Sequence, residues 1–271
     1  MWYGCFGVNT GEHRFGEINM RILFTICGRA GSKGIKNKNL RWFCGRYLAY
    51  YSMSVIDLFL RRHSDIGYDI VVNSDSQELL SIISNNGLRE VTPIVREEAL
   101  SGDSIGKIAV VSDCLSKMRD MMNCLYDIVV DLDITSPLRT VEDLEKVISV
   151  HQSTGADVTT TVATARRNPY FNQVKRTGHG VRRVIESDFT ARQQAPEIYD
   201  LNASIYAYNP QYLNTGKGVL EGYCEIVEMY DTGILDLDHE NDFVLMELIA
   251  NYLIKNNDGF RKVYENIPNK E

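Results

Sequence analysis

A glycine-rich turn with basic side chains lies near the start of the chain, at residues 26–39. It follows an apolar run at residues 22–26 that has the length and composition of a buried strand. Glycines in the turn let the backbone bend tightly with its N–H groups free, and cations lie among them. Such a turn after a first strand is typical of a phosphate-binding loop. The alternative is an ordinary strand-to-helix turn with solvated lysines. The residues concerned are Gly28, Arg29, Gly31, Lys33, Gly34, Lys36 and Lys38.

The charge around this turn favours a small polyanion as the ligand. Residues 20–56 contain no Asp or Glu, although the chain as a whole carries a net charge of -7. A local basic segment in an acidic protein does not indicate a nucleic-acid surface. Two familiar phosphate motifs fail on spacing. Ala30 interrupts a dinucleotide fingerprint, and the order Ser32-Lys33-Gly34 is not that of a Walker A loop.

A pair of carboxylates near the other end of the chain could bind a metal ion. Asp236 and Asp238 are two residues apart, so on an extended backbone they point to the same side. Mg²⁺ in proteins is commonly held by one or two carboxylates and completes its shell with phosphate oxygens and water. The alternative is a solvated acidic loop that caps the helix expected from residue 241. A magnesium pair would complement the basic turn in phosphoryl transfer.

The elements between these motifs alternate as strands and helices. The patterns predict strands at 69–73, 91–95, 126–131 and 157–163, and helices at 47–61, 77–86, 104–118 and 141–151. This alternation predicts an α/β fold, a Rossmann-like and mostly parallel sheet flanked by helices. Strand-exit loops of such a sheet lie along one rim, where ligands bind. We expect four of them there: 28–39, 74–75, 96–104 and 133–139.

The pattern changes after about residue 166. Antiparallel strands are expected at 171–176 and 181–185, within an insertion at about 164–200. Further strands are expected at 205–209, 224–229 and 234–237, and a helix at 241–252. We expect one main domain at 20–255, preceded by an extension at 1–19 that is disordered or reads from an upstream start codon. Residues 256–271 would form a C-terminal tail.

Composition excludes several classes of protein. The 271 residues are 44% hydrophobic and 24% charged, as in ordinary globular domains. No apolar run approaches the ~18–20 residues that a membrane span needs. The six cysteines are scattered without a Cys-x-x-Cys pair, which favours reduced thiols and a cytoplasmic location.

The basic turn resembles a known signature. Arg29-x-x-Ser32-Lys33-Gly34 followed by Lys38-Asn39 is similar to the opening of the acylneuraminate cytidylyltransferase (CMP-sialic acid synthetase) family. Residues 132–139 resemble that family's Leu-Gln-Pro-Thr-Ser-Pro-Leu-Arg block. Residues 192–196 and 201–206 resemble its Arg-Gln-Gln-x-Pro and Asn-Gly-Ala-Ile-Tyr blocks, and residues 236–238 its Asp-x-Asp. The blocks occur in the family's order over about residues 20–250, so together they are specific.

The resemblance implies a reaction and its participants. CMP would pass from CTP to the anomeric hydroxyl of an acidic nine-carbon sugar, a nonulosonic acid, with in-line loss of pyrophosphate. Mg²⁺ would be the cofactor, and Asp236 or a metal-bound hydroxide would be the general base. The 164–200 insertion would pack on a second subunit in a homodimer or homotetramer. Neither nucleic acid nor a membrane would be a partner.

The resemblance also implies roles for individual residues. Arg29, Ser32, Lys33 and Lys38 would bind the triphosphate, and Arg29 and Lys38 would neutralise the leaving group. Asn39 and Arg96 would contact ribose and base, and Asp236 and Asp238 would hold the metal. The sugar would meet Asp133, Arg192, Gln193 and Asn202, with Arg192 and Gln193 facing its acidic part because a guanidinium fits a carboxylate.

Three positions depart from the family pattern. Asp133 replaces a Gln, and an ionised carboxylate would repel a nearby sugar carboxylate, so we expect a nonulosonic acid other than N-acetylneuraminate. Ala203 replaces a Gly, which could tighten the sugar pocket, and Gly28 replaces an Ala, a mild change. The alternatives are the same fold acting on another nucleotide or acidic sugar, and a non-catalytic sugar- or nucleotide-binding homologue.

Overall fold

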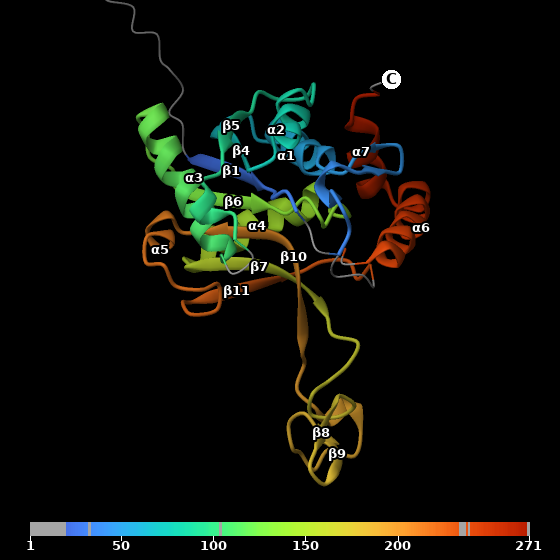
Figure 1. Ribbon diagram of the computed structural model, residues 1–271. Coiled ribbons are helices and arrows are strands. Elements are labelled where there is room, and N and C mark those ends of the chain that lie inside the picture. The colour runs from blue at the N-terminus through green and yellow to red at the C-terminus, as the bar shows by residue number, and fades with distance from the viewer. Residues whose placement is uncertain (1–19, 32–33, 103–104, 233–236, 238, 270–271) are drawn as a thin grey trace, which may run out of the picture.

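The computed structural model describes residues 20–31, 34–102, 105–232, 237 and 239–269. Its centre is a seven-stranded sheet in the order β11-β7-β10-β6-β1-β4-β5. The strand next to the basic turn, β1 (Arg21–Cys27), is therefore in the interior of the sheet (Figure 1). The other strands of this sheet are β4 (Gly67–Ser74), β5 (Thr92–Val95), β6 (Ile128–Leu132), β7 (Val158–Thr164), β10 (Tyr199–Tyr208) and β11 (Cys224–Glu228).

The sheet is mostly parallel, as expected. β10 runs antiparallel to both of its neighbours, β6 and β7, and the remaining neighbouring pairs are parallel. The carboxyl ends of β1, β4, β5 and β6 consequently meet at one edge. The loops that leave these strands are brought together there.

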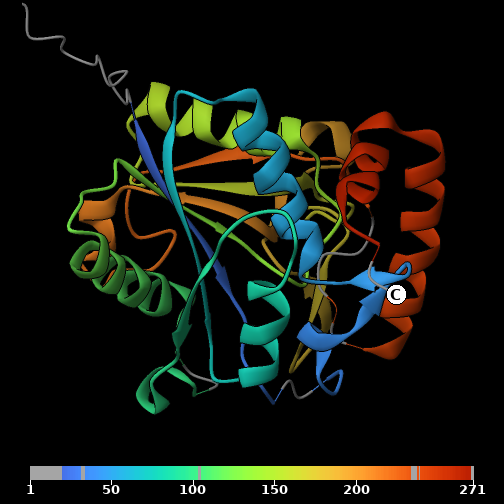
Figure 2. The same ribbon diagram turned by 90° about the horizontal axis from the view of Figure 1, so that it is seen from above.

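Helices cover both faces of the sheet (Figure 2). One apolar cluster packs α1, α2, α4, α6 and α7 against one face, and another packs α3 on the opposite face beside α5. The alternation of side chains along β1 explains this: Phe24 and Ile26 belong to the first cluster and Leu23 to the second. The helices are α1 (Tyr50–Arg62), α2 (Gln77–Ser84), α3 (Lys107–Met122), α4 (Val141–Thr154), α5 (Pro210–Leu213), α6 (Glu240–Asn256) and α7 (Asp258–Asn266).

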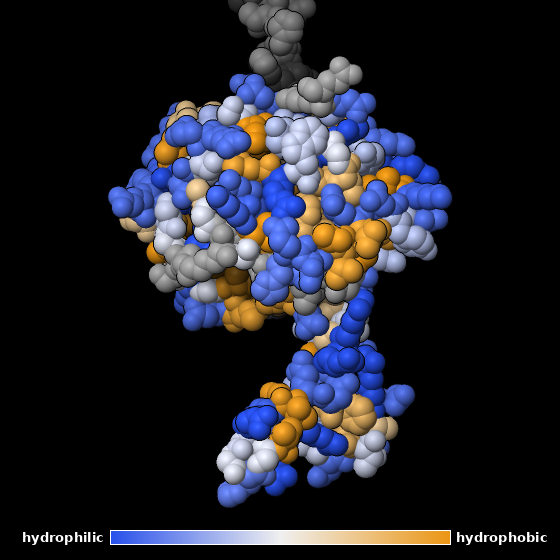
Figure 3. Space-filling model, turned by 45° about the vertical axis from the view of Figure 1, so that its right-hand side comes forward, coloured by the Kyte–Doolittle hydropathy of each residue, from blue (hydrophilic) through white to orange (hydrophobic). Residues whose placement is uncertain are grey.

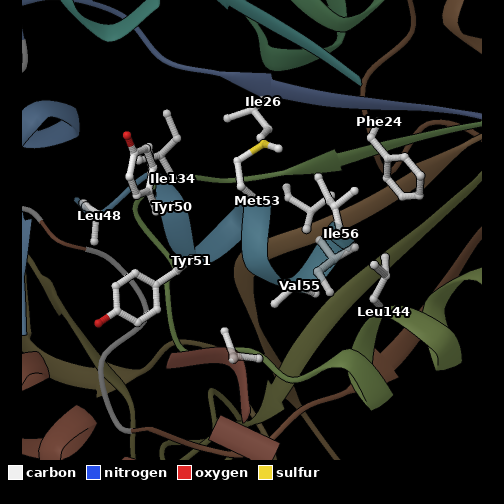
Figure 4. Packing of buried hydrophobic residues seen from close by; sticks show 14 of the residues in the cluster. Phe24, Ile26, Leu48, Tyr50, Tyr51, Met53, Val55, Ile56, Ile134 and Leu144 are labelled. Atoms are coloured by element: carbon white, nitrogen blue, oxygen red, sulfur yellow. The ribbon is translucent and has the colours of Figure 1, made fainter. Parts of the chain in front are cut away.

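The larger cluster lies beneath the basic turn. Figure 4 shows Met53 and Ile56 of α1 pointing towards Phe24 and Ile26 of β1, with Leu144 of α4 beside them. These side chains are fully buried. The close packing fixes β1, and so the start of the turn, relative to the helices.

Local sequence signals account for several helix ends. α2 begins after Ser76, whose Oγ accepts a hydrogen bond from the Leu79 N–H at 3.2 Å. α4 begins with a reciprocal capping box between Thr140 and Asp143, and it ends at Gly155 with φ of 64°. These helices are among those that the sequence predicted.

Several elements were not among the predictions, including α5. A hairpin of β2 (Trp42–Phe43) and β3 (Arg46–Tyr47) precedes α1, where Tyr47 was expected to be helical. Residues 256–271, expected as a tail, include α7, whose Phe260 and Val263 are buried against the core. The expected extension at 1–19 lies outside the described residues, as does most of the strand expected at 234–237.

An arm leaves the body between β7 and β10 (Figure 1). It carries a separate two-stranded antiparallel sheet of β8 (Val174–Thr177) and β9 (Gly180–Arg183). These strands confirm the expected antiparallel pair in the 164–200 insertion. In the described parts of the chain, no helix has the length and apolar character to cross a membrane.

Candidate active site

A cavity of about 300 Å³ opens at the carboxyl ends of the parallel strands. The loops after β1, β5 and β6 contribute Arg29, Arg96 and Asp133, and the loop before α3 completes the wall. The expected gathering of strand-exit loops is thus present. The lining residues are Cys27, Gly28, Arg29, Lys38, Asn39, Arg96, Leu100, Gly102, Ile105, Lys107, Val110, Asp133 and Thr135.

The basic turn is tied to the neighbouring strand exit. The Gly28 N–H donates to the Asn73 carbonyl at 3.1 Å, and the Ala30 N–H donates to Asp75 Oδ1 at 2.6 Å. Two of the backbone N–H groups that were expected to be free in this turn thus have protein partners. Asn39 Nδ2 donates to the Arg29 carbonyl at 3.1 Å. Ser32 and Lys33 lie outside the described residues.

Asn39 and Arg96 both line the cavity, but their side chains differ in their hydrogen bonds. Asn39 lines the cavity, and its buried Oδ1 accepts no hydrogen bond within the part of the chain that the structure describes. Arg96 is only 9% exposed. Its Nε donates to Asn73 Oδ1 at 2.6 Å, and its Nη2 donates to the Asn73 carbonyl at 3.1 Å. Asn73 thereby fixes the Arg96 guanidinium at the cavity wall.

The segment near residue 237 returns to the basic turn from the far end of the chain. Lys38 Nζ donates to the carbonyl of the fully buried Leu237 at 2.8 Å. Arg41 forms a salt bridge with Glu240 at 2.6 Å, and its guanidinium lies 4.0 Å from the centre of the Phe243 ring. The predicted metal residues Asp236 and Asp238 lie outside the described residues.

A partly buried ion cluster lies at the cavity wall, which Lys107 and Asp133 line. Lys107 Nζ lies 2.8 Å from Asp131 Oδ2 and 2.7 Å from Asp133 Oδ2. Asp131 is inaccessible to solvent, and its Oδ1 accepts a hydrogen bond from Thr25 Oγ1 at 2.7 Å. Asp133 Oδ1 accepts from both the N–H and the Oγ1 of Thr135, each at 2.8 Å. The two carboxylates share one ammonium group.

The contacts within the cluster favour the charged forms of Lys107 and Asp133. Burial alone would lower the pKa of Lys107, but Asp131 and Asp133 outweigh it and raise that pKa well above the ordinary value. Burial would likewise raise the pKa of Asp133, but Lys107 and Thr135 lower it to about 2. Repulsion of an acidic sugar by Asp133, expected from the sequence, is therefore offset by a cation in direct contact.

Lys107 and Asp131 were missed in the sequence. Asp131 was placed at the end of a strand and Lys107 inside a helical run, without functional roles. The signal was the pair Asp131 and Asp133, two residues apart where a central strand ends. A carboxylate inside a buried strand requires a cation, but nothing in the sequence indicates which of the many Lys and Arg residues supplies it.

The other residues expected to contact the sugar do not line this first cavity. They are Arg192, Gln193 and Asn202. Arg192 and Gln193 line a second cavity of about 600 Å³ at the base of the arm. Asn202 is buried, and its Oδ1 accepts a hydrogen bond from Thr161 Oγ1 at 2.6 Å where β10 bulges away from β7. Ala203 in the same bulge has a left-handed φ of 50°. It does not line the first cavity.

Comparisons with known proteins agree with this architecture. A cytidylyltransferase family model matches residues 23–230. The chain is 34% identical over 228 residues to post-translational flagellin modification protein B of Campylobacter coli, covering 84% of this chain and 94% of that protein. It is 33% identical, with the same coverage, to CMP-N,N'-diacetyllegionaminic acid synthase of Campylobacter jejuni.

A solved structure shares the fold. CMP:2-keto-3-deoxy-manno-octonic acid synthetase complexed with CTP superposes with a TM-score of 0.58 at 15% identity, covering 87% of this chain and 99% of that chain. The matched family residues include β1, the cavity loops that follow β5 and β6, and the arm. The chain belongs to the cytidylyltransferase family and is a nucleotidyltransferase.

Proposed function

We propose that this enzyme transfers CMP from CTP to the anomeric hydroxyl of a nonulosonic acid and releases pyrophosphate. Relatives that cover most of the chain are named as a synthase of CMP-N,N'-diacetyllegionaminic acid and as N-acylneuraminate cytidylyltransferases, the latter at 23% identity. A pseudaminic acid cytidylyltransferase matches 44% of the chain at 33% identity. The sugars in these names are nonulosonic acids.

The observation that carries the proposal is the order of groups along the cavity. In the sheet, β1 lies between β4-β5 on one side and β6 on the other. Arg96, after β5, and Asp133, after β6, therefore flank the turn that bears Arg29 and Lys38. A nucleoside near Arg96 and Asn39 would place its phosphates at the cationic turn. The acceptor sugar would then lie towards Asp133.

The residues of this chain would promote the reaction mainly by placing charged groups next to the substrates. Arg29 and Lys38 would neutralise the pyrophosphate as negative charge develops on the leaving group. Rigid placement of both reactants would lower the entropic cost of bringing them together. Asn39 Oδ1 would accept a hydrogen bond from a ribose hydroxyl.

Magnesium belongs to the proposal through Asp236 and Asp238. A magnesium site beside the cavity is supported by Leu237, which lies between these two residues in the sequence. Its carbonyl contacts Lys38 at the cavity wall. Carboxylates are suitable ligands for Mg²⁺, and the bound ion would neutralise phosphate oxygens during transfer. Asp238→Ala should abolish turnover at saturating Mg²⁺ without changing the thermal unfolding midpoint. Near-normal turnover would remove the metal assignment.

The arm belongs to the proposal as a contact between subunits. Val174 and Val181 lie on one face of the small arm sheet and are 61% and 54% exposed. Figure 3 shows apolar side chains gathered on the protruding arm. An isolated two-stranded sheet is only marginally stable in water, so cover by a second copy would stabilise it. Val174→Asp combined with Val181→Asp should lower the mass measured by light scattering to that of a monomer.

The activity is tested with the purified chain, MgCl2 and each of the four NTPs. The acceptors are N-acetylneuraminate, N,N'-diacetyllegionaminate, pseudaminate and 2-keto-3-deoxy-manno-octonate. Pyrophosphate release with CTP and one nine-carbon acid, with the CMP-sugar identified by mass, is the expected result. Turnover only with another nucleotide or with the eight-carbon acid would replace the proposal with the same-fold alternative. Nucleotide binding without turnover in any pair would indicate a non-catalytic homologue. Because this reaction needs CTP, which is available in the cytoplasm, we propose a cytoplasmic location.

A further inference from the structure

The ion cluster of Lys107, Asp131 and Asp133 connects a buried strand to the cavity wall. Lys107 is the first residue of α3, and its side chain reaches two carboxylates at the end of β6. Its ammonium also lies 5.1 Å from the centre of the Tyr206 ring on β10. One cation thus links three elements directly at the wall of the cavity.

The hydrogen bonds of Asp133 leave one defined position for a ligand. Each carboxylate oxygen can accept about two hydrogen bonds. Both positions of Oδ1 are taken by Thr135, and one position of Oδ2 is taken by Lys107. The second position of Oδ2 has no partner among the residues that the structure describes, and the Asp133 side chain, which is 20% exposed, lines the cavity. An ionised carboxylate accepts hydrogen bonds and donates none.

We propose that Lys107 is a positioning residue that makes Asp133 a single fixed acceptor, selecting an acceptor sugar with an N–H or O–H donor at that place. This inference rests on the proposed function and refines its sugar specificity. Without the ammonium, two neighbouring carboxylates would repel both each other and an anionic sugar. With it, Asp133 keeps its orientation, and one of the two negative charges of the cluster is compensated.

The surrounding backbone supports this role. The Asp133 N–H donates to the Ser204 carbonyl at 3.0 Å. The fully buried Arg139 donates from Nη1 to the same Ser204 carbonyl at 2.7 Å and from Nη2 to the Asp133 carbonyl. Residue 133 is therefore anchored through its backbone independently of Lys107. Removal of the Lys107 charge should change the side chain of Asp133 more than its location.

The central experiment replaces the charge of Lys107 and keeps its length. Lys107→Met is compared with the wild type in steady-state assays that vary the sugar and CTP separately, with the best acceptor found for the wild type. We expect the KM for the sugar to rise at least tenfold and the KM for CTP to change less than threefold. Lys107→Arg, which retains a cation, should recover most of the sugar affinity.

A pH profile separates positioning from a merely structural contribution. The charged and titratable groups around Asp133 are Lys107 from α3, Asp131 from β6, Arg139 beyond it, and the Tyr206 and Tyr208 phenols from β10. With Lys107 in place, Asp133 stays ionised across pH 5.5–8, and the KM for the sugar should not vary through this group. In Lys107→Met, the pKa of Asp133 should rise because its main cation is gone, so the KM should become dependent on pH below about 7.

A matched control is available on the same helix. Lys117 of α3 pairs with Glu97 and Asp113, each at 2.9 Å, and does not line the cavity. Lys117→Met should leave both KM values and the pH profile unchanged. Combining Lys107→Met with Asp133→Asn should remove the new pH dependence, because no carboxylate remains at residue 133.

The outcomes separate this inference from the proposed function. A wild type that uses no nonulosonic acid would refute the function itself. An active wild type whose Lys107→Met variant raises both KM values alike, or keeps a flat pH profile, would refute the role of Lys107 alone. Sugar-selective loss with a new pH dependence, absent in Lys117→Met, would establish it.

Discussion

Gly28, the first residue after β1, has no room for a side chain. A Cβ built on it would lie 2.5 Å from Leu79 Cδ2 and 2.9 Å from Ile134 Cδ1. Both neighbours are buried in the main core, where side chains cannot move aside freely. The difference from the family's Ala, which the sequence suggested to be mild, lies at a position where this chain leaves no space for a methyl group. Gly28→Ala should overpack the core.

The expected cost follows from these contacts. Adding a methyl group to a well-packed core costs roughly 1–3 kcal/mol, and two contacts below 3.0 Å place Gly28→Ala near about 2 kcal/mol. A chain of this size should then lose roughly 4–8 °C in Tm. Arg29 follows Gly28 directly, so a displaced turn should also raise the KM for CTP. Urea titration monitored by tryptophan fluorescence measures the free energy of unfolding.

A double-mutant cycle tests the cause rather than the cost alone. Leu79→Val removes the Cδ2 atom that the new methyl group would meet, at a cost of about 1 kcal/mol by itself. If the clash is real, Gly28→Ala should be milder in the Leu79→Val background by about 1–2 kcal/mol. Additivity within about 0.5 kcal/mol would refute the reasoning. Gly178→Ala, with no heavy atom within 4 Å, should change stability by less than about 0.5 kcal/mol.

Three further predictions concern stability. Ala203→Gly should stabilise the fold by up to about 1 kcal/mol in urea titration, because glycine relieves the left-handed φ of 50° at a smaller entropic cost; a loss would contradict this. Arg89→Met should lower the free energy of unfolding by about 2 kcal/mol, because it removes the 2.6 Å ion pair with Asp57, whose side chain is only 1% exposed. A change below about 0.5 kcal/mol would show that the other partners of Asp57 are enough to stabilise its charge. Burial lowers the pKa of His151, which contacts Thr159, to about 4. Between about pH 6.5 and 4 the unfolded state binds more protons at His151 than the folded state does. Since one pH unit corresponds to at most 1.36 kcal/mol, the free energy of unfolding should fall by about 2 kcal/mol from pH 6.5 to 5. His151→Gln should lack this component, and an equal fall in both proteins would refute it.

The location of several cavity residues could be predicted because they closely follow a strand in the sequence. Arg29, Lys38 and Asn39 follow β1 closely, so the position of one strand brought all three to the cavity. Arg96 could be placed as well, because it directly follows β5 at the same edge of the sheet. The partner that fixes it, Asn73, ends a different strand and was not identified.

Contacts over long sequence distances were harder to predict. Lys38 meets Leu237 across 199 residues, and no local pattern encodes that pairing. Arg192 and Asn202 were named from their motifs, and the tertiary structure places them away from the first cavity. Their motifs were recognised, but the arm carries Arg192 to a separate cavity, and Asn202 turns inward to satisfy the Thr161 hydroxyl in a bulge. A motif indicates residue types and order but not the direction of a side chain.

The order of apolar and glycine-rich segments alone determined the mostly parallel sheet and the basic turn after its first strand. These are local properties, set by periodicity and by charge within a few residues. Only the tertiary structure decided that Lys107 pairs with Asp131 and Asp133, and that Leu79 and Ile134 fill the space beside Gly28. Such contacts depend on how helices and strands pack in three dimensions, and many cations and apolar side chains of the chain could have filled either role.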